Sequence, residues 1–267
     1  MALIELTVYS QALQMEVDLY AVLPETTKGL IGMDGKAAEH CPTLYLLHGM
    51  SDDHSIWQRR TSIERYAAEK GLAVIMPAAD LSYYSDMHMG ENYWQFVARE
   101  LPGICRSLFP MLSPDREDTF VAGLSMGGYG ALKCALRASD TFSCGAGLSA
   151  VADIVDTVTK LTKRRIGQAA YWQDVFGDPA ALPGSFNDLF TAASDYAKNE
   201  ISKPIRLYMW CGTEDGLYDE NVRLRNLLQA LGLDLTYEES PGNHAWVYWD
   251  KKIQDVINWL PIRKEAQ

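Results

Sequence analysis

A serine flanked by glycines lies between two apolar segments of the chain. Ser125 is the centre of a Gly-x-Ser-x-Gly pattern, which follows an apolar run from residue 119 and precedes a stretch rich in small residues. Between a strand and a helix, this pattern is typical of a strained turn that lifts a serine hydroxyl clear of a sheet. We therefore expect Ser125 to be a nucleophile, with an ordinary strand-to-helix turn as the alternative. A dinucleotide-binding loop is disfavoured, because the glycines do not give Gly-x-Gly-x-x-Gly in register.

A serine hydroxyl needs a base to become a nucleophile, and that base needs an acid to orient it. His244 is the candidate base, because it lies in a turn-rich loop between the last expected strand and the last expected helix. Asp215 is the candidate acid, because it follows an apolar strand in a glycine-containing turn between Ser125 and His244. Glu214 and Asp219 are the local alternatives, and Asp219 suits a helix-capping role better.

When a serine activated in this way attacks a carbonyl group, an oxyanion forms. Two backbone N–H groups are expected to stabilise this oxyanion. One is that of Met126, directly after the nucleophile. The second is that of Met50, where Gly49 permits the chain to turn inward after an apolar strand. His48 ends that strand and is placed to shape the site. A plain strand-to-loop turn is the alternative for this segment.

Strand and helix patterns alternate along most of the chain. The expected strands cover residues 4–10, 15–23, 43–49, 72–77, 119–124, 142–148, 205–211 and 235–239, and the expected helices cover 56–70, 93–109, 126–138, 220–231 and 246–260. The first two strands alternate apolar and polar residues, whereas the later ones are nearly all apolar. The pattern predicts an α/β fold with a mostly parallel central sheet, helices on both faces and an N-terminal antiparallel hairpin.

One long segment interrupts this alternation. Residues 150–204 contain helix-like runs at 151–161 and 168–176, and lie between two expected strands. We expect residues 1–267 to form a single domain in which this segment is a helical excursion over the site. Helices that pack without contacting a substrate are the alternative.

Composition and charge exclude several classes of protein. The 267 residues are 48% hydrophobic and 22% charged, with a formal net charge of −11, which disfavours nucleic acid, anionic membranes and polyanionic substrates. No apolar segment is long enough to span a bilayer, and the N-terminus lacks a signal-peptide pattern. Five scattered cysteines argue for reduced thiols and against a zinc site. We expect a cytoplasmic protein with no metal and no cofactor; the sequence leaves a homo-oligomer open.

Four motifs together resemble the esterase D family of α/β-hydrolases, which includes S-formylglutathione hydrolases, feruloyl and acetyl-xylan esterases, mycolyltransferases and bacterial tributyrin esterases. The motifs are residues 48–53 followed by Trp57, residues 123–131, residues 211–215 and residues 242–244. Residues 83–86 and 91–94 look most like the tributyrin esterases. The resemblance covers nearly the whole chain and implies an α/β-hydrolase fold.

The resemblance implies a serine esterase that cleaves short-chain acyl esters through an acyl-enzyme. It assigns the nucleophile, acid and base to Ser125, Asp215 and His244, and the oxyanion amides to Met50 and Met126. The residues that we expect near the substrate are His48, Trp57, Tyr84 and Trp246. The alternatives are a carbohydrate deacylase, an S-formylglutathione-type thioesterase and a non-catalytic protein on the same fold. The thioesterases usually carry a Leu-Ser-Gly-Leu type segment where this chain has residues 48–50, which argues against a glutathione substrate.

Overall fold

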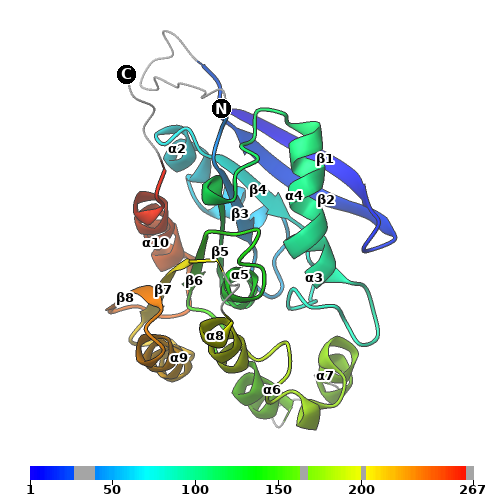
Figure 1. Ribbon diagram of the computed structural model, residues 1–267, viewed down its shortest axis with the longest axis vertical. Helices are drawn as coiled ribbons and strands as arrows, with labels where there is room; N and C mark the ends of the chain where they lie inside the picture. The colour runs from blue at the N-terminus through cyan, green and yellow to red at the C-terminus, as the bar shows by residue number, and fades with distance from the viewer. Residues whose placement is uncertain (27–39, 163–167, 200–202, 263–267) are drawn as a thin grey trace.

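An eight-stranded sheet forms the centre of the computed structural model, which describes residues 1–26, 40–162, 168–199 and 203–262 (Figure 1). The strands are β1 (Ala2–Ser10), β2 (Met15–Leu23), β3 (Thr43–Leu47), β4 (Ala73–Pro77), β5 (Thr119–Leu124), β6 (Cys144–Leu148), β7 (Arg206–Gly212) and β8 (Asp234–Ser240). Their order across the sheet is β1-β2-β4-β3-β5-β6-β7-β8. Strand β2 is antiparallel to both of its neighbours, and the strands from β4 to β8 run parallel. The expected parallel sheet with its N-terminal hairpin is confirmed.

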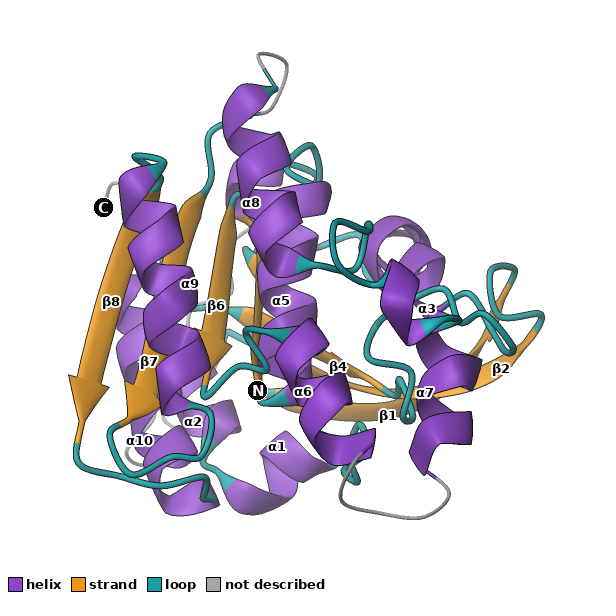
Figure 2. Cartoon of the chain, turned by 90° about the horizontal axis from the view of Figure 1, so that it is seen from below, coloured by secondary structure: helices purple, strands orange, loops and turns teal. Residues whose placement is uncertain are grey.

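Helices cover both faces of this sheet (Figure 2). One face carries α1 (Ile56–Arg60), α2 (Ile63–Ala68) and α10 (Trp246–Trp259), and the other carries α3 (Tyr93–Gln95), α4 (Leu101–Leu108), α5 (Met126–Arg137), α6 (Ile154–Thr162), α7 (Gln168–Phe176), α8 (Leu189–Lys198) and α9 (Tyr218–Ala230). Successive strand residues enter alternate layers: Leu44 and Leu46 of β3 pack in the first core, and Tyr45 and Leu47 in the second. Burial on both faces explains why these strands are almost entirely apolar.

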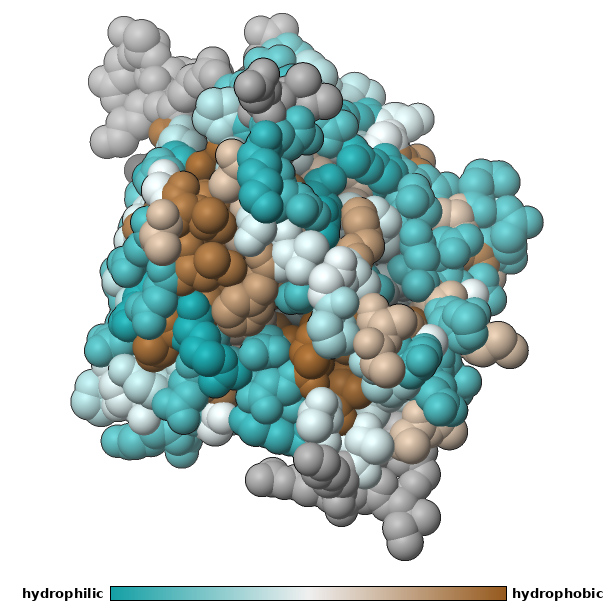
Figure 3. Space-filling model, turned by 60° about the horizontal axis from the view of Figure 1, so that its bottom comes forward, coloured by the Kyte–Doolittle hydropathy of each residue, from teal (hydrophilic) through white to brown (hydrophobic). Residues whose placement is uncertain are grey.

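Strand β1 lies at the edge of the sheet and is only half-buried. Its residues alternate, with Leu3 and Tyr9 exposed and Ile4 and Leu6 packed against the core. On the face that Figure 3 presents, apolar patches are separated by hydrophilic surface. No helix in the described ranges is long and apolar enough to cross a membrane. All five cysteines lie in the core, as expected for small buried residues.

The helix expected over residues 56–70 is instead two short helices, and this prediction is wrong. The chain turns extended at Thr61, between α1 and α2. The Thr61 hydroxyl donates to the Trp57 carbonyl at 2.6 Å and accepts the Ile63 N–H at 3.1 Å. A threonine side chain that bonds to the backbone in this way competes with the helical hydrogen bonds and ends the helix.

The other expected elements are found within three residues of their predicted ends. Helices α3 and α4 make the expected helix over residues 93–109, joined by a π-helical turn at Phe96–Glu100. Helix α9 begins at Tyr218, two residues early, because the carbonyl of Asp215 accepts the Tyr218 N–H at 3.0 Å.

The segment at residues 150–204 contains α6, α7, a 3₁₀ turn at Pro179–Ala181 and α8; its residues 163–167 and 200–202 lie outside the described residues. Helix α8 lies between α5 and α9, and α6 lies beside α7 (Figure 2). The segment therefore packs on the sheet's own helices. That it also covers the site stays a prediction.

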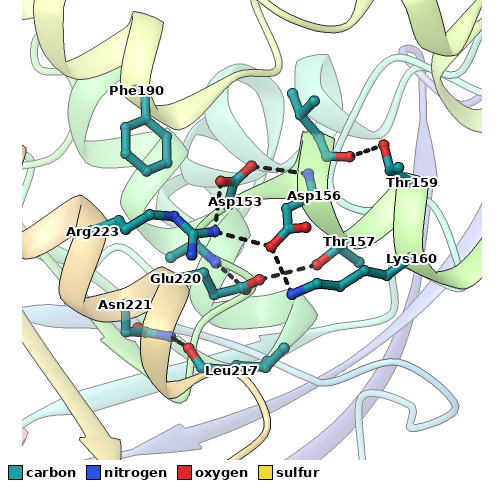
Figure 4. Close-up of polar contacts among 12 residues, drawn as sticks. Asp153, Asp156, Thr157, Thr159, Lys160, Phe190, Leu217, Glu220, Asn221 and Arg223 are labelled. Carbon is teal, nitrogen blue, oxygen red and sulfur yellow. Dashed lines mark hydrogen bonds and ion pairs between the residues drawn. The ribbon is translucent and has the colours of Figure 1, made fainter.

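A buried carboxyl group joins the start of α9 to the chain that leaves β6 (Figure 4). Glu220 is 3% exposed, and its two oxygens accept the Ala152 N–H at 2.9 Å and the Thr157 hydroxyl at 3.4 Å. Burial raises the pKa of Glu220 to about 8, although hydrogen bonds from the backbone oppose this change. The side chain is therefore protonated in the folded protein at neutral pH.

Ion pairs surround this carboxyl group. Arg223, on α9, contacts Asp153 at 2.9 Å and Asp156 at 3.0 Å, and Lys160 contacts Asp156 at 2.7 Å (Figure 4). Ion pairs thus join α6 and its preceding loop to Arg223 of α9. They hold the 150–204 segment against the helix that follows the candidate acid.

We expect Glu220→Gln to remove a pH dependence of stability. The unfolded chain releases the Glu220 proton near pH 4.5 and the folded protein near pH 8, so folding takes up a proton in this window and stability falls as pH rises. The effect is on the order of 1 kcal/mol per pH unit. In urea unfolding at pH 5, 7 and 9, the free energy of unfolding of the variant should rise relative to that of the wild type as the pH increases. The exposed Glu16→Gln is the matched control, and parallel pH curves for wild type and Glu220→Gln would contradict the assignment.

The loops after β7 and β8 touch through backbone atoms. A Cβ at Gly212, the last residue of β7, would overlap the carbonyl group of Gly242. The same carbonyl oxygen accepts the Glu214 N–H at 2.9 Å, and the Ser240 oxygen accepts the Thr213 N–H at 3.0 Å. A side chain at residue 212 would force the two loops apart.

Gly212→Ala should therefore destabilise the protein by about 1–3 kcal/mol, because a backbone group cannot rotate away from the added methyl. Gly216→Ala, in the same loop, adds a methyl that meets no atom within 4 Å and is the matched control. Urea unfolding of both variants checks this. Equal stabilities of the two variants would show that the loops separate without cost.

Candidate active site

Ser125 lies on a sharp turn between β5 and α5. Its backbone has φ 52° and ψ −116°, in the region that a residue with a side chain rarely adopts. A Cβ at Gly123 would overlap the Gly127 carbonyl group, and a Cβ at Gly127 would overlap the Leu47 carbonyl oxygen. The close approach of strand and helix therefore requires both glycines.

The three candidate side chains of the triad meet at the carboxyl ends of β5, β7 and β8. His244 Nε2 lies 3.0 Å from Ser125 Oγ, and His244 Nδ1 lies 2.9 Å from Asp215 Oδ2. The His244 side chain is 37% exposed and the Asp215 side chain is fully buried. Glu214 and Asp219, the alternative acids, are exposed. The imidazole thus bridges a hydroxyl and a buried carboxylate, so it can take a proton from one while its own charge is balanced by the other.

The carboxylate of Asp215 is held by several donors. Burial alone would raise its pKa, but the hydrogen bond and charge of His244, the Leu217 N–H and the Ser149 hydroxyl outweigh burial, so the pKa of Asp215 lies below its ordinary value. The Leu217 N–H donates to Oδ1 at 2.9 Å. Asp215 is therefore an anion at neutral pH and orients the imidazole through Nδ1–H.

Two residues behind the acid were not identified from the sequence. Trp249 Nε1 donates to Ser149 Oγ at 3.1 Å, and the Trp249 ring meets the His244 ring edge-on at 4.8 Å. Ser149 has a left-handed backbone, with φ 45°. Its place directly after β6, at the edge where the site gathers, was the signal that could have pointed to it.

The amides of Met50 and Met126 have no acceptor among the described residues. The Gly49 carbonyl oxygen accepts the Asp52 N–H at 3.2 Å and lies 2.8 Å from His48 Nδ1. In a trans peptide the C=O and N–H groups point in opposite directions, so these contacts hold the Met50 N–H away from them. Both amides are available to an anion, as an oxyanion site requires.

The His48 ring is neutral and has a defined tautomer. Its Nε2 accepts the Ala79 N–H at 3.0 Å, so the proton is on Nδ1 and is donated to the Gly49 carbonyl. Burial lowers the pKa of His48, although the Gly49 carbonyl opposes this effect. The ring therefore acts as a bridge between the residue 79 backbone and the loop that carries Met50.

Of the four residues expected near a substrate, three are buried and one is partly exposed. His48, Trp57 and Tyr84 are at most 1% exposed. Trp57 Nε1 donates to the Leu47 carbonyl at 2.9 Å, and the Tyr84 hydroxyl donates to the His48 carbonyl at 2.8 Å. Trp246 is partly exposed and packs on Trp57, with ring centroids 5.1 Å apart. The three buried side chains thus hold the backbone of residues 47–49 through hydrogen bonds, and substrate contact by any of the four residues stays a prediction.

In the part of the chain that the structure describes, no three His, Cys, Asp or Glu side chains lie close enough together to hold a metal ion. The candidate groups for proton transfer at this site are the side chains of Ser125, His244 and Asp215.

Nearly the whole chain matches known esterases. The family model described as "Putative esterase" matches residues 10–260. An acetyl esterase from Caldicellulosiruptor saccharolyticus is 33% identical over 263 residues, which cover 97% of this chain and 98% of that protein.

Two solved structures from Staphylococcus aureus share the fold over their full length. The fluorophosphonate-binding serine hydrolase FphF, in a substrate-bound structure, is 33% identical with a TM-score of 0.85, covering 98% of this chain and 99% of that one. The S-formylglutathione hydrolase FrmB is 33% identical with a TM-score of 0.82, covering 97% and 98%. The chain therefore belongs to this esterase family, the esterase D family of α/β-hydrolases that its motifs resemble, and is a carboxylic ester hydrolase.

Proposed function

We propose that this enzyme hydrolyses short-chain acyl esters, of the tributyrin or acetyl type, through an acyl-enzyme on Ser125. The observation that carries the proposal is the hydrogen-bonded path from Ser125 Oγ to His244 at 3.0 Å and on to the buried Asp215 at 2.9 Å. A hydroxyl linked in this way to an imidazole and a carboxylate is the arrangement that activates a serine.

In the proposed reaction, Ser125 Oγ attacks the ester carbonyl carbon while His244 Nε2 takes the hydroxyl proton. Asp215 stabilises the resulting imidazolium, and the Met50 and Met126 N–H groups donate to the oxyanion. The C–O bond to the alcohol then breaks and His244 returns its proton to the leaving oxygen. Water attacks the acyl group by the same steps in reverse, releasing the acid and restoring Ser125.

The relatives support a small acyl group. The acetyl esterase is similar over 97% of this chain, and residues 83–86 and 91–94 resemble the tributyrin esterases. A thioesterase is the second candidate, because FrmB is equally similar, at 33% identity. The loop at residues 48–50 still departs from the sequence usual in that group, so we rank the ester first.

We place this activity in the cytoplasm, with small-molecule esters as its substrates. The five cysteines buried in the core suit a reducing compartment. The net charge of −11 disfavours polyanionic partners.

Ser125→Ala should lower kcat on p-nitrophenyl acetate by about 10⁶, because the variant lacks the nucleophile. It should keep its thermal stability and lose labelling by a fluorophosphonate probe. Ser107→Ala, on the exposed side of α4, is the control and should keep both activity and labelling. A Ser125→Ala variant that remains active or labelled would overturn the assignment.

A substrate panel separates the proposed ester from its competitors. We expect kcat/KM to be highest for acetyl to butyryl p-nitrophenyl esters and to fall by about 10-fold or more at octanoyl, since a small pocket rejects added methylenes. Acetylated xylo-oligosaccharides and S-formylglutathione complete the panel. A higher kcat/KM for either of these would transfer the function to a carbohydrate deacylase or a thioesterase.

A further inference from the structure

The turn at residues 79–86, which follows β4, lies behind the loop that carries Met50. Two hydrogen bonds join the turn to that loop. The Ala79 N–H donates to His48 Nε2 at 3.0 Å, and the Tyr84 hydroxyl donates to the His48 carbonyl at 2.8 Å. The Tyr83 hydroxyl lies 3.8 Å from the Met50 sulfur. None of these contacts involves a group that takes part in the proposed proton transfers.

The backbone of this turn is strained. Asp80, Tyr83 and Tyr84 have φ values of 45°, 51° and 49°, in the left-handed region that residues with a Cβ seldom adopt. Such a conformation persists only where the surroundings determine it, and it collects at functional sites. The tyrosines are 2% and 0% exposed, so packing holds them in place.

Anchors fix the turn to the neighbouring elements. Lys133 Nζ, fully buried on α5, donates to the Ser85 hydroxyl at 2.7 Å and to Asn187 Oδ1 at 3.1 Å. The Tyr171 hydroxyl, on α7, donates to the Leu81 carbonyl at 2.6 Å. The turn is thus held from α5 and from two parts of the 150–204 segment.

Gly130 makes room for the Tyr84 ring. A Cβ at Gly130, on α5, would come within 2.5 Å of Tyr84 Cδ2 and 2.6 Å of Cγ. At Gly123 and Gly127 the nearest atoms are backbone atoms, whereas the three atoms nearest to a Cβ at Gly130 all belong to the Tyr84 side chain. A methyl group at residue 130 therefore acts on Tyr84 selectively.

Two successive carbonyl groups before Met50 each have a donor. The Tyr84 hydroxyl fixes the His48 carbonyl, and the His48 ring, with the Asp52 N–H, fixes the Gly49 carbonyl. Fixing these two planar peptide groups sets the direction of the Met50 N–H. We infer that Tyr84, seated against Gly130, is a positioning residue that holds the Met50 amide in place for the oxyanion; this inference rests on the proposed function.

Tyr84→Phe tests this role, because it removes the hydroxyl and keeps the ring. A misdirected oxyanion donor should lower kcat and kcat/KM together by about 10- to 100-fold, with KM unchanged within about twofold, since the interaction is made only in the transition state. The inhibition constant of a boronic acid, which places an oxygen where the oxyanion forms, should rise by a similar factor. Tyr45→Phe is the matched control, because the Tyr45 hydroxyl is equally buried and faces Cys105.

Gly130→Ala tests the same contact from the other side. It should reduce kcat as Tyr84→Phe does, and the double variant should lose no more than the worse single variant. Gly103→Ala, whose added methyl on α4 meets no atom within 4 Å, is the control for a helical glycine and should keep full activity.

The proposed function is tested first, by the activity of the wild type and its loss in Ser125→Ala. An inactive wild type overturns both proposals. With an active wild type, a Tyr84→Phe variant of unchanged kcat and boronic acid affinity overturns the positioning role alone. An equal loss in Tyr45→Phe, or multiplied losses in the double variant, also overturns it. A loss confined to Tyr84→Phe and Gly130→Ala supports it.

Discussion

The close contact between the end of β3 and the start of α5 is the constraint on which the site depends. No side chain fits at Gly127, because the Leu47 and His48 carbonyls occupy that space. The contact forces Ser125 into a strained turn and brings the first amide of α5 beside the loop that follows β3. Ser125 and the Met50 and Met126 amides thus come together from segments more than seventy residues apart in sequence, because parallel strands β3 and β5 are neighbours in the sheet.

The same sheet topology brings in His244 and Asp215, the candidate base and acid. Strands β5 to β8 run parallel in chain order, so each one delivers a loop to the same edge: Ser125, Ser149, Asp215 and His244 follow β5, β6, β7 and β8. The order of the three candidate residues along the chain is then a consequence of sheet topology. The Gly212–Gly242 backbone contact brings the last two loops close enough for Asp215 to reach His244.

Sequence patterns predicted most of this fold because periodicity reports burial, and burial on both faces is what distinguishes β3 to β7. The patterns failed at Thr61, where one hydroxyl ends a helix that the apolar spacing continues. They singled out Ser125, Asp215 and His244 as candidates from turn chemistry, but they did not predict the burial of His48, Trp57 and Tyr84. Aromatic and imidazole side chains look alike in sequence whether they line a pocket or support a loop. Only their hydrogen bonds to the Leu47, His48 and Gly49 carbonyls show that these side chains hold the backbone of the loop.

In the proposed reaction, the unequal burial of Asp215 and His244 suits both the acylation and the deacylation step. Asp215 is fully buried, so its charge is not screened by water and depends on the Leu217 N–H, the Ser149 hydroxyl and His244 for stabilisation. In the proposed mechanism, this charge favours the imidazolium that forms when Ser125 gives up its proton. The His244 side chain is 37% exposed, so solvent reaches part of it, as the release of an alcohol and the entry of a water in the proposed reaction require. A base buried as deeply as its acid would gain electrostatic strength but would lose the water that deacylation needs.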